Sequence, residues 1–123
     1  MKLEALVGGA AEVVGPETIL DDVAHLMVDR SIDAVAVVER SDLVGIFTGH
    51  DLIRAIAEGV DGGTGIVADW MTPAPDVCAP DVPVAEAAAW LLETGYRHLL
   101  VMADDELLGI VGVRDLLWAL TND

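Results

Sequence analysis

The spacing of apolar side chains along the chain predicts a helix near its start. Apolar residues recur every three or four positions, which places them on one helical face: Leu20, Val23, Ala24 and Met27. Just before them, Thr18 and Asp21 have the spacing of a capping box, in which each side chain caps the backbone N–H of the other residue. We therefore expect an amphipathic helix that opens at Thr18.

Two short apolar runs follow this helix, at residues 34–38 and 43–47, and the polar segment 39–42 separates them. Valine-rich runs of this length are typical of buried strands, and a polar turn between two of them predicts a hairpin. A brief strand at 12–14 and a helix over about 48–58 complete a unit of strand, helix, strand, strand and helix.

The same succession recurs 64 positions later. Residues 12–59 align without a gap with residues 76–123 (76 − 12 = 64). Six identities fall in the stretch 43–56 alone, where Leu43, Gly45, Ile46, Asp51, Leu52 and Ala55 recur as Leu107, Gly109, Ile110, Asp115, Leu116 and Ala119. One such unit alone buries little apolar surface, so two copies are expected to share a core.

We predict an α+β fold of two βαββα repeats packed as a pseudo-two-fold pair. The first repeat is expected at residues 1–59 and the second at 67–123, with a glycine-rich linker at 60–66.

Charge narrows the choice of partners. The 123 residues carry 22 acidic and 6 basic side chains, a formal net charge of −16. Such a field repels nucleic acid and anionic membranes, so neither is expected as a partner. A surface rich in aspartate and poor in lysine is typical of proteins from salt-loaded cytoplasms, which gives a halophilic-type interpretation of the charge.

The sequence has no apolar run of the ~20 residues that a membrane-spanning helix needs, and Glu4 interrupts any signal-peptide core. We therefore expect a cytoplasmic protein. Cys78 is the single cysteine and replaces Val14 of the other copy, so a small buried apolar role is expected for it rather than a nucleophilic one.

Four segments resemble cystathionine-β-synthase (CBS) domains: GIFTGHD at 45–51, GIVGVRD at 109–115, GYRHLLV at 95–101 and DWMTP at 69–73. They stand in the order of a tandem pair, or Bateman module, of the stand-alone type. The resemblance covers almost the whole chain. It implies a regulatory module that binds an adenosine-containing ligand between the repeats, namely AMP, ADP, ATP or S-adenosylmethionine, and signals to a partner that the sequence does not identify.

The expected ribose ligands are Thr48, Asp51 and Asp115. A carboxylate near a helix start accepts hydrogen bonds from both ribose hydroxyls, and the exposed amides there favour a phosphate. A capping box explains Thr48 and Asp51 without any ligand. However, Asp115 persists although Gly112 replaces the threonine, which favours the ligand role.

The resemblance also assigns phosphate contacts to Arg97 and His98, which would complete a site with Thr48 and Asp51. Arg114 is a compensating candidate in the other cleft, and His50 is a further candidate phosphate ligand. The alternative for Arg97 is a surface ion pair, worth at most ~1 kcal/mol. The residues that correspond to Arg97 and His98 are Asp33 and Ala34 (97 − 64 = 33). We therefore expect unequal clefts, with the tighter one at Asp51.

For adenine, the resemblance implies an apolar slot in each repeat, and the alternative for these residues is ordinary core. The slots would comprise Val14, Val35 and Ala36 in one repeat and Cys78, Leu99 and Leu100 in the other.

Other function classes find less support. His25, His50 and His98 lack the spacing of zinc ligands, and no nucleophile has a recognisable setting, so we expect no metal, no further cofactor and no enzyme. The alternative is an interaction module with decayed sites that binds no small ligand. In either case a homodimer is expected through the helices, where Trp118 replaces Arg54 and adds an apolar side chain.

The charge generates a prediction about stability. Because like charges repel across the folded surface, added potassium chloride should raise the thermal unfolding midpoint between low and molar concentration by screening that repulsion. A midpoint that stays flat or falls over this range would contradict it.

Overall fold

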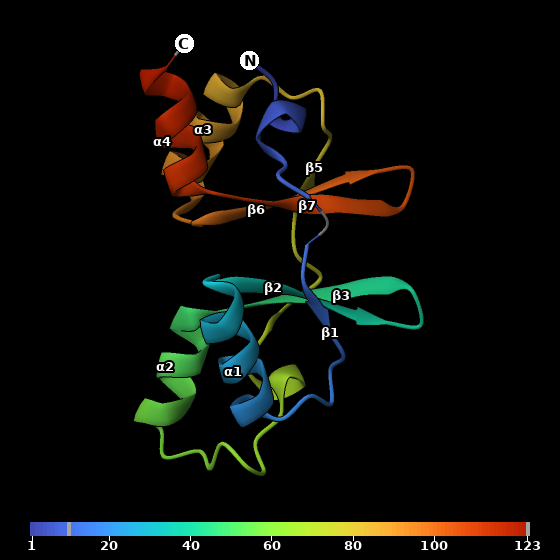
Figure 1. The fold of residues 1–123 in the computed structure, drawn as a ribbon, viewed down its shortest axis with the longest axis vertical. Helices are drawn as coiled ribbons and strands as arrows, with labels where there is room; N and C mark the ends of the chain where they lie inside the picture. The colour runs from blue at the N-terminus through green and yellow to red at the C-terminus, as the bar shows by residue number, and fades with distance from the viewer. Residues whose placement is uncertain (10, 123) are drawn as a thin grey trace. The chain divides into compact units, whose positions relative to one another are not determined.

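The computed structural model describes residues 1–9 and 11–122, and these residues divide into two compact units (Figure 1). Unit 2 comprises residues 12–75, and unit 1 comprises residues 76–123 together with the amino-terminal segment 1–11. Ala10 of that segment and Asp123 of the predicted second repeat lie outside the described residues.

Unit 2 contains the first copy of the predicted succession. Its elements are β1 (Val13–Val14), α1 (Leu20–Arg30), β2 (Ala34–Glu39), β3 (Asp42–Thr48), α2 (Gly49–Ala57), a 3₁₀ turn (Val67–Asp69) and β4 (Thr72–Pro73). The sheet has the order β1-β2-β3-β4, with β1 parallel to β2 and the remaining pairs antiparallel. Both helices lie on one side of it (Figure 1).

Unit 1 repeats this arrangement. Its elements are a 3₁₀ turn (Leu3–Leu6), β5 (Val77–Cys78), α3 (Val84–Thr94), β6 (His98–Ala103), β7 (Glu106–Gly112) and α4 (Val113–Thr121). The sheet order is β5-β6-β7, again with one parallel and one antiparallel pair. The α+β class, the two βαββα repeats and both hairpins are thus confirmed.

Each unit has its own apolar core between its helices and its sheet. In unit 2 the fully buried side chains include Val35, Val37 and Phe47, and in unit 1 they include Leu99, Val101 and Val111. Val35, Val37, Leu99 and Val101 alternate along β2 and β6, as the two-residue period of a strand requires.

The short segments that precede the repeats do not pack with the copy that follows them. Residues 1–11 belong to unit 1, with the second copy, and residues 67–75 belong to unit 2, with the first. Strand β4 was not predicted, because a Thr-Pro pair gives no strand signal. It exists because the backbone of Thr72 and Pro73 pairs with Ile46 and Gly45 of β3.

The predicted capping box of the first helix is wrong. Helix α1 begins at Leu20 after Ile19, which gives no side-chain cap. The backbone N–H groups of Leu20 and Asp21 instead donate to the carbonyl oxygens of Gly65 and Gly62, at 3.0 and 2.9 Å. The glycine-rich linker therefore caps α1 and satisfies donors that would otherwise lack partners.

Gly45 and Gly109 allow a second backbone segment to approach each hairpin. A Cβ atom on Gly109 would lie 2.7 Å from Val7 Cγ1 and 3.2 Å from the Gly9 carbonyl oxygen. A Cβ atom on Gly45 would lie 3.0 Å from the Thr72 carbonyl oxygen and would also collide with the Met71 sulfur. The identity at these two aligned positions thus has a steric cause.

We predict that Gly45→Ala and Gly109→Ala each lower the free energy of unfolding by about 1–3 kcal/mol, because the segment packed against each glycine must move to admit the methyl group. Gly15→Ala is the matched control, since no atom of the described residues, apart from its chain neighbours, lies within 4 Å of its Cβ position. Chemical denaturation measures all three, and equal stability of the three variants would refute the steric explanation.

Candidate functional site

The junction between β3 and α2 holds Thr48 and Asp51 in a reciprocal capping box. The Thr48 backbone N–H and hydroxyl donate to Asp51 Oδ2 at 2.9 and 3.1 Å. In return, the Asp51 backbone N–H donates to the Thr48 hydroxyl oxygen at 3.4 Å. The capping interpretation of this pair is therefore confirmed, and the ligand role of the carboxylate stays a prediction.

Asp51 has a third partner that the sequence analysis did not identify. Arg54 Nη2 donates to Asp51 Oδ1 at 3.2 Å, and the Asp51 side chain is only 8% exposed. Arg54 also donates to the Trp70 carbonyl oxygen at 3.1 Å, and its guanidinium carbon lies 5.5 Å from the centroid of the Trp70 ring. Both Asp51 oxygens therefore have donors within unit 2.

The spacing of Asp51 and Arg54, one helical turn apart, was available as a signal. The contact of Arg54 with Trp70 had no such signal, because nothing in the sequence indicates that residues 16 positions apart meet.

The junction between β7 and α4 keeps only half of this arrangement. The Gly112 backbone N–H donates to Asp115 Oδ2 at 2.9 Å, but glycine has no hydroxyl to return the bond. Asp115 is exposed, whereas Asp51 is buried. Capping therefore accounts for part of the recurrence of Asp115, and its second oxygen has no donor among the described residues.

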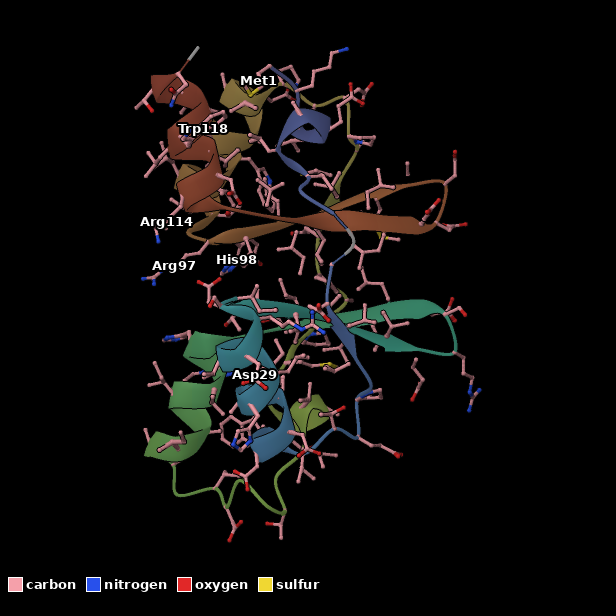
Figure 2. All side chains as sticks on the ribbon, in the orientation of Figure 1. Met1, Asp29, Arg97, His98, Arg114 and Trp118 are labelled. Atoms are coloured by element: carbon pink, nitrogen blue, oxygen red, sulfur yellow. The ribbon has the colours of Figure 1, made fainter. Side chains whose placement is uncertain are left out.

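Three basic side chains gather beside Asp115. The Val113 backbone N–H donates to the Arg97 carbonyl oxygen, and His98 pairs with Gly112 across the sheet. Figure 2 shows Arg97, His98 and Arg114 at the same end of unit 1. Arg97 and Arg114 are exposed and form no ion pair with any described residue, so the surface ion pair considered for Arg97 is absent there.

The corresponding end of unit 2 has a different charge. Asp33 and Ala34 stand where Arg97 and His98 stand in unit 1, and the exposed His50 takes the place of Arg114. The Gly49 backbone N–H donates to the Asp33 carbonyl oxygen, which mirrors the Val113–Arg97 bond. The expected site that combines Arg97 and His98 with Thr48 and Asp51 draws on residues of different units and stays a prediction.

The residues of the expected adenine slots divide between the two faces of each sheet. Val35 and Leu99 belong to the cores beneath the helices, with Val14 and Cys78 packed at their margins. Ala36 and Leu100 are buried on the alternate face of their strands. The ordinary-core alternative therefore holds for Val35 and Leu99, while the slot remains a prediction for the others.

Cys78 is half-buried, and burial, with Asp76 and Glu86 nearby, raises the pKa of its thiol. The thiol therefore stays protonated at neutral pH, which fits a packing role rather than a nucleophilic one.

Within residues 1–9 and 11–122, no three His, Cys, Asp or Glu side chains are placed to hold a metal ion. In the same part of the chain, no helix has the length and apolar character needed to cross a membrane.

The sequence model of the CBS domain matches residues 10–58 and 67–122. YhcV, a CBS domain-containing protein of Bacillus subtilis, is 30% identical over 104 residues, which are 84% of this chain and 74% of YhcV. Other curated relatives are longer, and the chain spans 54% of the CBS domain-containing protein CBSX2 of Arabidopsis thaliana, at 29% identity over 128 residues and 80% of this chain.

Solved structures have the same fold. A putative signal-transduction protein with CBS domains from Burkholderia ambifaria has a TM-score of 0.94 at 24% identity, with 100% of this chain and 96% of that chain covered. The crystal structure of CBSX2 in complex with AMP has a TM-score of 0.85 at 28% identity, with coverage of 98% and 97%.

Proposed function

Because the chain belongs to the CBS domain family and carries two of these domains, we propose that it binds an adenosine-containing ligand, with AMP as the first candidate, and transmits the bound state to a partner protein. Tandem CBS domains are regulatory ligand-binding modules. The observation that carries the proposal is the recurrence of a carboxylate at the start of α2 and of α4, at Asp51 and Asp115.

The ribose is assigned to these carboxylates. A carboxylate at a helix start presents two acceptor oxygens beside the positive end of the helix, which suits a pair of vicinal hydroxyls next to a phosphate. Thr48 orients Asp51 in advance, so little side-chain freedom is lost on binding there. Among the described residues, Asp115 accepts a hydrogen bond from one backbone N–H alone, which supports tighter binding at Asp51.

The phosphate is assigned to Arg97, His98 and Arg114, with His50 as a further contact. In a chain with a formal charge of −16, two exposed arginines without acidic partners among the described residues are a favourable place for an anion. AMP is preferred over the other adenosine compounds because CBSX2, at 28% identity, was crystallised in complex with AMP. ADP, ATP and S-adenosylmethionine remain candidates for the same site.

We predict that AMP at a hundredfold excess over its dissociation constant stabilises the protein by ~2.7 kcal/mol, or about ten degrees in the unfolding midpoint.

Calorimetric titration of AMP into two variants shows which carboxylate belongs to the tighter binding site. A charge-assisted hydrogen bond is worth about 1.5–3 kcal/mol, so Asp51→Ala should weaken tight binding at least tenfold, while Asp115→Ala should leave it largely intact.

The reverse pattern in these two variants would move the tighter site to Asp115. An unfolding midpoint unchanged by AMP and by the other adenosine compounds would instead favour the interaction module without a small ligand.

For the assembly, we propose a homodimer through the last helix of each repeat. Ile53 and Ile56 on α2 are each 65% exposed, and the aligned Leu117 and Leu120 on α4 are 56% and 47% exposed. Trp118 adds a further ring that is 57% exposed. Since the repeat places matching apolar pairs on two helices, a second copy of the chain with the same pairs is a fitting partner.

We predict a dimer at micromolar concentration in molar salt, and dissociation to monomers by Leu117→Glu, because a carboxylate would be buried in an apolar interface. Leu92→Glu on α3 is the matched control, since Leu92 is 88% exposed and lies outside the two helices. Sedimentation velocity measures all three proteins. A wild-type monomer, or a Leu117→Glu dimer, would contradict the proposed interface.

A further inference from the structure

Arg54 occupies an oxygen of Asp51 that a ribose would need. Asp51 Oδ2 is held by the Thr48 backbone N–H and hydroxyl, at 2.9 and 3.1 Å. Asp51 Oδ1 accepts from Arg54 Nη2 at 3.2 Å. The two oxygens of a carboxylate together accept about four hydrogen bonds, and Asp51 already accepts three from Thr48 and Arg54. Two ribose hydroxyls therefore exceed the remaining capacity, and the partly exposed Arg54 guanidinium is the donor that a ligand would replace.

Arg54 also contacts Trp70, and these contacts can hold its guanidinium when it leaves Asp51. Its Nη2 also donates to the Trp70 carbonyl oxygen at 3.1 Å, and its guanidinium lies over the Trp70 ring. The Arg54 side chain is 47% exposed, whereas that of Asp51 is 8% exposed. Arg54 can therefore leave the carboxylate without leaving the surface of unit 2, and the movement alters the surroundings of Trp70.

From this geometry we propose that Arg54 is an intramolecular competitor for the ribose at Asp51, so that ligand binding displaces its guanidinium and changes the environment of Trp70. The inference rests on the proposed function, because it takes Asp51 as a ribose ligand. It makes Arg54 a residue that sets the affinity of that site. Through Trp70, ligand binding would also change the segment that leads into β4.

The competitor is specific to one repeat. The position of Arg54 is held in the second copy by Trp118 (118 − 54 = 64), and that of Trp70 by Leu6 (70 − 6 = 64). Asp115 accordingly has no arginine on its free oxygen among the described residues. The two carboxylates share a place in the fold and differ in what a ligand must displace.

The first test is calorimetric titration of AMP into the full chain. Arg54→Met removes the charge and keeps an unbranched apolar side chain near Trp70, so we expect binding at Asp51 to become about three- to fivefold tighter, the scale of a partly exposed ion pair. Arg54→Lys keeps a competing cation and should bind AMP with near wild-type affinity. If Arg54→Met does not fold, Arg54→Gln takes its place.

Arg30→Met is the matched control, because Arg30 forms a surface ion pair with Glu12 at 3.6 Å in the same unit. It should leave AMP affinity unchanged. The gain of Arg54→Met should vanish when Asp51→Ala is added, because the competition acts only through that carboxylate.

The second readout is the fluorescence of Trp70, isolated by Trp90→Phe and Trp118→Phe. AMP should shift its emission when Arg54 is present and much less in Arg54→Met. The competition would be overturned if the wild type binds AMP and Arg54→Met binds it no more tightly. It would also be overturned if Arg54→Lys binds AMP as tightly as Arg54→Met. In both cases the proposed function stands. Absence of AMP binding to the wild type would overturn the proposed function, and this inference with it.

Discussion

In each repeat, the direct passage from a strand into a helix depends on one hydrogen bond. The carboxylate three residues inside the helix, Asp51 or Asp115, accepts the N–H of the residue that ends the strand, Thr48 or Gly112. Without it, a backbone donor at the helix start would lack a partner where the chain turns from the sheet to the helix. The same bond fixes a carboxylate at the positive end of the helix, so the fold itself generates the acceptor that the proposed ligand uses.

Around this common bond the two repeats have diverged in charge. Unit 2 surrounds its carboxylate with Thr48 and Arg54, which leave no oxygen without a donor. Unit 1 leaves its carboxylate exposed and places Arg97 and Arg114 beside it without acidic partners among the described residues. A duplicated fold thus carries two chemically different ends, and this difference is the reason why we propose unequal binding.

Much of the fold could be predicted because the internal repeat doubles every weak local signal. The alternating and helical periods gave βαββα twice, with both hairpins in place. Two features of the fold could not be predicted from local sequence patterns. The α1 cap comes from the carbonyl oxygens of Gly62 and Gly65, more than 40 residues away, so the local Thr18–Asp21 spacing misled. Strand β4 exists only through its long-range pairing with β3.

The candidate site could be predicted in part for the same reason. The carboxylates and the basic residues stood out by position and type, whereas the contact of Arg54 with Trp70 depends on tertiary packing across 16 residues. The most direct test of the proposed chemistry is a crystal structure of the protein with AMP. We expect the ribose hydroxyls within about 3 Å of the Asp51 carboxylate, with the Arg54 guanidinium withdrawn from it. AMP bound elsewhere, with the Asp51–Arg54 pair intact, would contradict the proposed site.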